Sequence, residues 1–192
     1  FTGSLIRKLC FLSFLFLSIN SAALDDGTWT YELVGDNVEV TGCYSACSKD
    51  LVIPNTIAGK SVTIIGAEAF RAINLASVII PNNVITIGHS AFYGNNLASV
   101  IIPNNVITIG GWAFRSNQLT SLIIGSSVTN IGAVAFEGNQ LFNVTIPDSV
   151  LSIGEDAFKN NIVTDNGVWE YYLLSDNIVI SGYFKRSLQA YF

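Results

Sequence analysis

Apolar residues recur with a fixed step of 22 positions through the middle of the chain. The step is seen in the leucines that open each copy and in the phenylalanines and Ile-Gly pairs inside it. These are Leu75, Leu97, Leu119 and Leu141; Phe70, Phe92, Phe114, Phe136 and Phe158; and Gly66, Gly88, Gly110, Gly132 and Gly154. A fixed period of this length is typical of a solenoid, whose repeats stack as coils. The pattern therefore predicts a mainly β fold of about five coils over residues 51–162.

The copy at 97–118 shows which positions of a coil face the core. We expect Leu97, Val100 and Ile102 to point inward from a short strand. Pro103 should end this strand, because proline has no N–H to donate to the ladder. Each coil is thus predicted to contribute one strand to a parallel sheet, with the alternate positions facing solvent.

The second half of the same copy predicts a shorter extended segment and two corners. Val106 and Ile109 should point inward, and Gly110 is expected to allow a tight corner. The Ala113-Phe114 pair is expected to pack inside one helical or 3₁₀ turn. Asparagines end the copies, where a buried amide could bond backbone groups that the corner leaves unpaired. They are Asn95, Asn117, Asn139 and Asn161.

Residues 24–50 precede the array and have the pattern of a β-hairpin. Apolar and polar residues alternate over 28–42, with turn residues at 35–37. A solenoid exposes its first edge, so we interpret this hairpin as an N-terminal cap. Cys43 and Cys47 follow it, and in an exported chain they favour a disulfide over free thiols. Two thiols alone are too few for a zinc site.

Residues 163–192 contain a second copy of the hairpin sequence. Trp169, Asn177 and Gly182 repeat Trp29, Asn37 and Gly42 at a distance of 140 positions. Two interpretations remain open. The hairpin is a C-terminal cap, or it is the start of a truncated second module.

Residues 1–23 have the three parts of a secretory signal peptide. Arg7 and Lys8 form a positive start, an apolar run covers 10–19, and small residues precede Leu24. The apolar run is about half as long as a membrane span requires. We therefore expect a secreted or cell-surface protein with no membrane span after signal cleavage. The absence of an initial methionine indicates a reading frame that is incomplete at its start.

Charge and composition exclude several classes of partner. The 192 residues are 50% hydrophobic and 12% charged, with a formal net charge of −5. A nucleic-acid-binding protein would have a basic surface, so no nucleic-acid partner is expected. An acidic chain is also repelled by anionic lipid.

No pattern in the chain predicts catalysis, a metal site or a cofactor. The one histidine, His89, aligns with Gly111, Ala133 and Glu155 of other copies, so we interpret it as a solvated corner. Glu155-Asp156 is interpreted as surface charge. The sequence has neither a phosphate-binding loop nor a nucleophile elbow, and we predict that the chain is not an enzyme.

The outward strand positions are the candidate binding residues. Three isoleucines align between the inward residues, and three serines align beside them. Phe142 lies next to this stripe in the last copy. The candidates are Ile79, Ile101, Ile123, Ser77, Ser99, Ser121 and Phe142. Aligned exposed apolar residues form a patch, which indicates recognition, although isoleucine also suits any strand. Tyr93 and Trp112 should lie on another face.

The repeat L-x-x-V-x-I-P-x-x-V-x-x-I-G-x-x-A-F-x-x-N resembles the BspA-like (Treponema-type) leucine-rich repeat, most clearly over 75–118. The resemblance implies a leucine-rich-repeat solenoid with parallel strands on a concave face. It also implies an exported bacterial protein that binds other proteins, some relatives being adhesins. The chain departs at Gly125, where other copies have proline, and we expect one loosened turn there.

We consider three hypotheses about function. The first is a non-catalytic adhesion module whose strand face binds a protein or a surface glycan of unknown identity. The second is a structural spacer repeated within a larger surface protein. The third, an enzyme with a catalytic domain after Phe192, has no support in the residues present.

Overall fold

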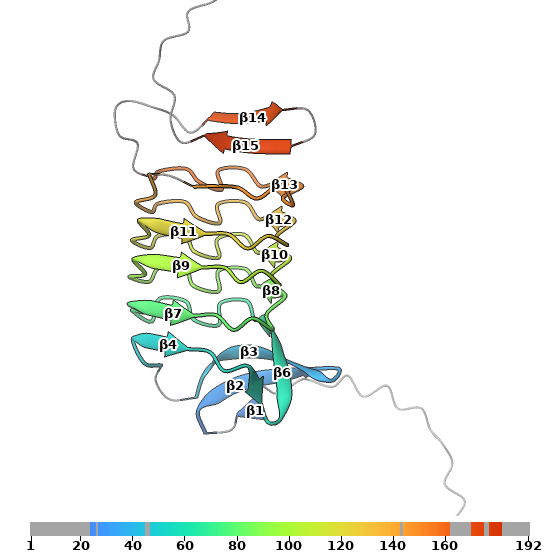
Figure 1. The fold of residues 1–192 in the computed structure, drawn as a ribbon. Coiled ribbons are helices and arrows are strands. Elements are labelled where there is room, and N and C mark those ends of the chain that lie inside the picture. The colour runs from blue at the N-terminus through green and yellow to red at the C-terminus, as the bar shows by residue number, and fades with distance from the viewer. Residues whose placement is uncertain are drawn as a thin grey trace, which may run out of the picture.

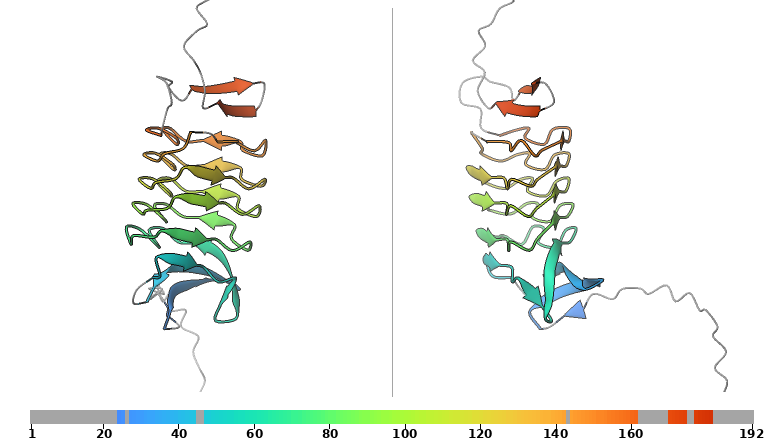
Figure 2. Two further views of the ribbon diagram at one scale, coloured as in Figure 1. Left: turned by 60° about the vertical axis from the view of Figure 1, so that its left-hand side comes forward. Right: turned by 45° about the vertical axis from the view of Figure 1, so that its right-hand side comes forward.

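The computed structural model describes residues 24–25, 27–44, 47–142, 144–161, 170–174 and 177–181. Strands and turns make up these segments, and none of the described residues is helical. The predicted signal peptide at 1–23 lies outside them. Five coils stack one above another in every view (Figures 1 and 2). We number them coil 1 (51–74), coil 2 (75–96), coil 3 (97–118), coil 4 (119–140) and coil 5 (141–161).

Two parallel ladders run along the stack, one on each side. The first ladder, which we call the strand face, contains β4 (Asp50–Val52), β7 (Ser77–Ile79), β9 (Ser99–Ile101) and β11 (Ser121–Ile123). β4 pairs with β7, and β9 with β11. The second ladder contains β6 (Lys60–Ile65), β8 (Thr86–Ile87), β10 (Thr108–Ile109), β12 (Asn130–Ile131) and β13 (Ser152–Ile153). Equivalent residues of the second ladder pair 22 positions apart, as Thr86 with Thr108. The sequence period of 22 therefore sets the register of the strands.

The predicted core positions are confirmed. Leu97, Val106, Ile109 and Phe114 have no exposed surface, and their equivalents in the neighbouring coils are buried in the same way. The phenylalanine rings stack on one another from Phe70 to Phe158, with ring centroids 5.1 to 5.4 Å apart. Offset aromatic stacking adds roughly 0.5–1.5 kcal/mol per pair to the burial of each ring. The stack forms one edge of the core along the whole array.

The asparagines form the corner ladder that the sequence predicts. Asn117 Nδ2 donates to the carbonyl oxygens of Phe92 and Phe114 at 2.9 and 3.1 Å. Its Oδ1 accepts from the backbone N–H of Leu97 at 3.2 Å. Asn95, Asn139 and Asn161 make the same contacts in their coils. In coil 1 the equivalent position is Ile73, which has no side-chain amide. The Oδ1 of Asn95 in coil 2 also accepts from the backbone N–H of Ile73.

The expected helical or 3₁₀ turn around Ala113-Phe114 is wrong. Two tight turns are formed instead, because Trp112 and Ser116 have φ values of 63° and 54°. A left-handed residue cannot continue a right-handed helix. Each coil repeats this pair of positive φ values, at Glu68 and Ala72 in coil 1 for example.

The role expected for Gly110 also needs correction. The glycine of the Ile-Gly pairs, which recurs every 22 positions, does not mark a positive φ, because the φ of Gly110 lies outside the left-handed region. A Cβ at Gly110 would lie 2.7 Å from backbone atoms of the coil below, and at Gly132 it would lie 2.3 Å from the N of Gly111. The glycines are therefore required by the close approach of stacked backbones.

Gly125 does not loosen its turn as expected. The turn is closed by a hydrogen bond from Val128 N–H to the carbonyl oxygen of Gly125 at 3.2 Å, as Val106 N–H bonds Pro103 at 3.1 Å. Gly125 is buried, and a Cβ would lie 2.3 Å from the carbonyl oxygen of Pro103. Without a ring at this position, coil 4 packs directly against the backbone of coil 3.

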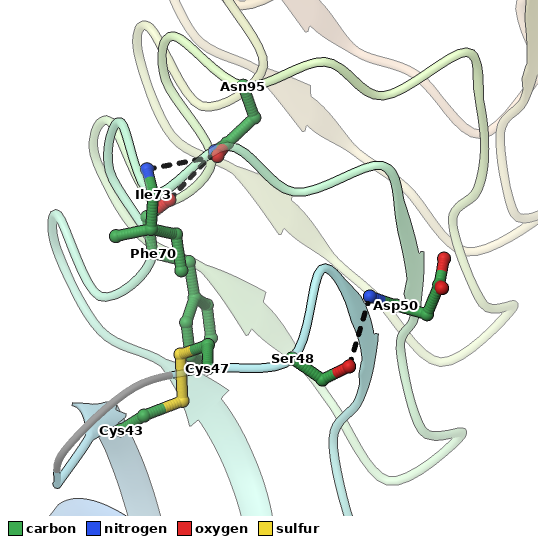
Figure 3. The surroundings of a disulfide bond; sticks show 7 residues. All are labelled: Cys43, Cys47, Ser48, Asp50, Phe70, Ile73 and Asn95. Atoms are coloured by element: carbon green, nitrogen blue, oxygen red, sulfur yellow. Dashed lines mark hydrogen bonds between the residues drawn. A yellow bond between two sulfur atoms is a disulfide. The ribbon is translucent and has the colours of Figure 1, made fainter.

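The N-terminal hairpin consists of β2 (Trp29–Val34) and β3 (Asn37–Cys43), with the short β1 (Leu24–Asp25) at its outer edge. β3 pairs in parallel with β6, so the hairpin continues the second ladder. Cys43 and Cys47 form a disulfide beside the ring of Phe70, the first in the stack (Figure 3). The ring of Trp29 meets Phe70 edge-on at 6.3 Å. The hairpin and disulfide together cover the start of the core.

The second hairpin is also a pair of antiparallel strands, β14 (Glu170–Leu174) and β15 (Asn177–Ser181). It lies beyond coil 5 in every view (Figures 1 and 2).

Candidate binding surfaces

The predicted isoleucine stripe lies on the strand face, exposed and aligned. Ile79, Ile101 and Ile123 are 61%, 63% and 56% exposed, each at the outward position of its strand. The register pairs Ile101 with Ile123 directly. Outward branched side chains on neighbouring strands lie close enough to touch. The structure therefore places these three residues on one face as an apolar stripe.

Val52 extends the stripe and was not among the predicted residues. It pairs with Ile79 in the register and is 59% exposed. The signal for it is Val52-Ile53-Pro54, which matches Ile79-Ile80-Pro81 of the next coil. The step between these copies is 27 rather than 22, which hid the correspondence.

The predicted serines form a second exposed row beside the stripe. Ser99 pairs with Ser121, and Ser77 pairs with Asp50, to which the Ser77 hydroxyl donates at 2.6 Å. Asp50 is the one charged residue in the four described strands of this face. Phe142 is 58% exposed in coil 5. It lies two positions before Val144, which is buried like the inward residues of the other strands. The face is thus aliphatic and hydroxylated, with little charge.

A second apolar row lies on the other ladder and was also missed. Ile85, Ile107 and Leu151 are exposed at equivalent positions, with Thr129 between the last two. Their backbones are joined in series, since Ile107 N–H donates to the carbonyl oxygen of Ile85 and Leu151 N–H to that of Thr129. Val106 and Ile109 are both buried with Ile107 exposed between them, so the inward positions predicted for the copy leave Ile107 and its equivalents as an outward row, and this signal would have identified it. It offers a natural control for tests of the strand face.

Aromatic and charged side chains gather at the turn edge of coils 1 to 4. The rings of Tyr93 and Trp112 lie 6.0 Å apart, and the guanidinium of Arg115 lies 4.0 Å from the centroid of Trp112. Arg115 also forms an ion pair with Glu137 at 2.8 Å. Cation–π contacts at such sites contribute about 0.5–1 kcal/mol. His89 is exposed beside Trp112, as expected for a solvated corner.

The described residues offer no constellation for metal binding, since no three His, Cys, Asp or Glu side chains converge among them. Asp156 is paired with Lys159 at 2.8 Å instead. One carboxyl group is perturbed: burial raises the pKa of Glu39 above its ordinary value, and the nearby Glu32 carboxylate raises it further. Glu39 lies in the cap opposite Glu32 in the register. Within the described segments, no helix is long and apolar enough to cross a membrane.

Comparison with known proteins identifies the repeat. The family model for the BspA type leucine-rich repeat region matches residues 41–164 in 6 copies. None of the curated proteins matches the chain.

Three solved structures share the fold. A leucine-rich repeat protein from Bacteroides ovatus is 27% identical with a TM-score of 0.57, covering 71% of this chain and 38% of its own. The leucine-rich repeat protein of T. pallidum is 26% identical with a TM-score of 0.60, covering 72% and 67%. The pneumococcal vaccine antigen PcpA, at 17% identity and a TM-score of 0.56 over 83% and 54%, supports the fold alone. The chain spans about two fifths of the Bacteroides protein and two thirds of the Treponema protein.

Proposed function

This chain belongs to the BspA-type leucine-rich repeat family, and we propose that it is an exported, non-catalytic binding module whose strand face contacts another protein. Leucine-rich repeat arrays are protein-interaction folds, and solenoids in general offer extended binding surfaces. The single observation that carries the proposal is the stripe of Val52, Ile79, Ile101 and Ile123 on the strand face.

The chemistry of the stripe favours a protein partner over a glycan. Its exposed side chains are branched and aliphatic, and the adjoining row is serine. The cores of protein interfaces are apolar and poor in charged residues, as this face is. Sugar rings are more commonly held by aromatic side chains and charged groups, which here lie on the turn edge around Trp112.

The exported location is supported by the sequence of 1–23 and by the disulfide Cys43–Cys47, because disulfides persist in oxidising compartments. Both named relatives above 25% identity are bacterial. We therefore place the protein at a bacterial cell surface or in the surrounding medium.

The test replaces Ile79, Ile101 and Ile123 with serine and measures binding of the full chain to immobilised collagen, fibronectin and laminin. Burying an isoleucine contributes about 1.5–3 kcal/mol when complete. Losing three partly buried contacts should weaken binding by roughly 100-fold. Circular dichroism and thermal unfolding should be unchanged, because the three side chains point away from the core.

The matched control replaces Ile85 and Ile107 with serine on the opposite ladder. These residues have the same chemistry, with exposures of 42% and 44%, so the control removes exposed apolar surface without touching the strand face. Equal loss of binding in both variants, or no loss in the first, would reject the strand face as the site. Binding to a glycan array with no binding to the proteins would make the partner a saccharide.

A structural spacer is the second candidate function. The observation that favours it is the second hairpin, which repeats the first at a distance of 140 positions. A spacer needs only a stable rod, so in a display assay both serine variants would leave adhesion by the parent protein intact. That result would support the spacer function and reject the hypothesis that the strand face binds a partner.

A further inference from the structure

Ring side chains gather at one place on the turn edge, where the repeat does not require them. The two positions after the glycine of each Ile-Gly pair and the position after the core phenylalanine vary from coil to coil, and His89, Tyr93 and Trp112 are the ring side chains among them. The ring centroid of Trp112 lies 6.3 Å from that of His89 and 6.0 Å from that of Tyr93, with tilts of 44° and 47° between the ring planes. Three rings from two successive coils therefore form one surface, which we call the aromatic patch.

The aromatic patch is open to solvent and lies outside the core. Trp112 is 37% exposed, His89 is exposed and Tyr93 is half-buried. None of the three belongs to the hydrophobic core, whose edge is formed at this level by the stacked rings of Phe92 and Phe114. The packing of the array therefore does not depend on the patch. Large amphipathic rings that remain in water at one spot indicate a binding surface.

Two arginines border the aromatic patch, and each is balanced by a carboxylate. Their guanidinium groups lie over rings of the patch, 5.2 and 4.0 Å from the ring centroids. Arg71 donates to Glu68 at 3.0 Å, and Arg115 pairs with Glu137 at 2.8 Å. The border thus favours neither an anion nor a cation, and we expect an uncharged ligand.

The polar atoms of the three rings are available to a ligand. The indole N–H of Trp112, the hydroxyl of Tyr93 and the ring nitrogens of His89 make no hydrogen bond to any other residue that the structure describes. The indole N–H is a donor, whereas the hydroxyl and a neutral imidazole both donate and accept. The patch therefore combines apolar ring surface with hydrogen-bonding groups of both kinds.

We propose that the aromatic patch binds a neutral saccharide, as a second binding site on a different side of the array from the strand face. One face of a sugar ring consists of C–H groups, which pack on the negative face of an aromatic ring. Its rim consists of hydroxyls, which donate and accept. Trp112 packs against the sugar ring, while His89 and Tyr93 bond its hydroxyls. A proline-rich peptide also packs on aromatic side chains, but proline has no N–H for the accepting groups.

The first experiment titrates the full chain with neutral oligosaccharides and follows the indole N–H signals of its three tryptophans by NMR. The probes are pentasaccharides of β-linked glucose, mannose, galactose and N-acetylglucosamine. The signal of Trp112 is identified as the one missing from Trp112→Asn. At least one probe should shift this signal saturably and leave the other two unchanged. No shift with any probe would overturn the proposal.

Two variants separate sugar binding from folding. Asparagine tolerates the φ of 63° at position 112, so Trp112→Asn should unfold at the temperature of the parent. Removing an aromatic residue from the centre of a site should weaken binding by roughly 30-fold or more. His89→Ala removes an exposed hydrogen-bonding group and should weaken binding by roughly 2- to 10-fold. Sugar binding that Trp112→Asn leaves unchanged overturns the proposal; if that variant does not fold, unchanged binding by His89→Ala does so.

The controls distinguish this site from the strand face. Tyr44→Ala removes an aromatic side chain that is 60% exposed next to the first hairpin, and it should bind the sugars as the parent does. The combined variant Ile79→Ser, Ile101→Ser and Ile123→Ser should also bind them normally. Trp112→Asn should in turn keep any binding to the matrix proteins, so the two proposals fail separately. A polyproline peptide that shifts the Trp112 signal at lower concentration than every sugar would make the patch a peptide site and overturn its assignment to a saccharide.

Discussion

Replacing Asn117 with alanine should be among the most damaging single changes in the array. The side chain is 6% exposed and lies at the corner where coils 2 and 3 meet. It donates to the carbonyl oxygens of Phe92 and Phe114 and accepts from the N–H of Leu97. Alanine would leave the Leu97 N–H without the partner it has now, whereas the carbonyl oxygens of Phe92 and Phe114 would each lose one of two amide donors and keep that of Asn95 or Asn139.

The magnitude follows from the cost of an unpaired group. A buried donor or acceptor that loses its partner costs about 1–3 kcal/mol. The Leu97 N–H falls in this class, and each of the two carbonyl oxygens loses one hydrogen bond worth about 0.5–1 kcal/mol net, which gives about 2–4 kcal/mol for Asn117→Ala. Asn117→Asp should cost at least as much, because a carboxylate keeps the acceptor for Leu97 and places negative charge against both carbonyl oxygens.

The assay is urea unfolding followed by circular dichroism, with hydrogen exchange to locate the effect. Repeat arrays open in sections, so the fastest new exchange should occur in coils 2 and 3. Asn105→Ala is the matched control. Its amide also donates to a backbone carbonyl, that of Asn82 at 2.8 Å, but the contact is exposed, and its loss should cost less than about 1 kcal/mol.

The reasoning is refuted if the two alanine variants unfold at the same urea concentration with the same slope. It is also refuted if Asn117→Asp is as stable as the parent. Either result would mean that the corner carbonyls are satisfied by water and that the asparagine ladder contributes only shape.

Four further changes test other parts of the structure. Gly132→Ala should destabilise by about 2–3 kcal/mol in chemical unfolding, because its Cβ would meet the backbone of the coil below; a neutral effect would contradict the close-approach explanation. Val134→Asn should raise the unfolding free energy by about 1 kcal/mol, since a β-branched residue at φ 61° is strained, and no gain would mean that the strain is absorbed elsewhere. Thr41→Val should stabilise by about 1 kcal/mol, because its buried hydroxyl has no partner; a loss would reveal a bound water. Glu39→Gln should stabilise at pH 7 and lose that advantage in acid: the folded-state pKa is raised by burial and by Glu32, so the parent gains stability as the pH falls through that pKa, and parallel pH profiles for parent and variant would rule the effect out.

The core could be predicted from the sequence because its residues recur at a constant spacing along the chain and the coils stack along a single axis. Leu97, Ile109 and Phe114 recur at 22 positions, and the period alone places equivalent residues above one another. The asparagine corner followed by the same argument, since a polar residue that recurs within an apolar repeat must be buried with partners.

Features that depend on the distance between coils could not be predicted. The need for glycine at Gly132 and the fit of Gly125 both come from backbones that approach across the stack, and no spacing along the chain expresses that distance. The left-handed turn residues were missed for a related reason. Trp112 and Val134 are side chains that disfavour positive φ, so composition pointed toward a helical turn.

The candidate stripe was predicted in its regular part and missed at its irregular end. Ile79, Ile101 and Ile123 follow the period, whereas Val52 is displaced by the five extra residues of coil 1. Whether the stripe binds a partner depends on a second molecule, about which the period carries no information.

The asparagine ladder also implies an order in which the coils fold during synthesis. Each asparagine reaches back to the coil before its own, as Asn117 does to Phe92 across 25 positions. A coil leaving the ribosome therefore keeps an open corner until the next 22 residues have emerged and supplied the amide that closes it. Folding would then advance from the hairpin cap one coil behind synthesis, each finished coil serving as the template for its successor. Deleting 22 residues should preserve this relay, whereas deleting 21 should stop it at the junction.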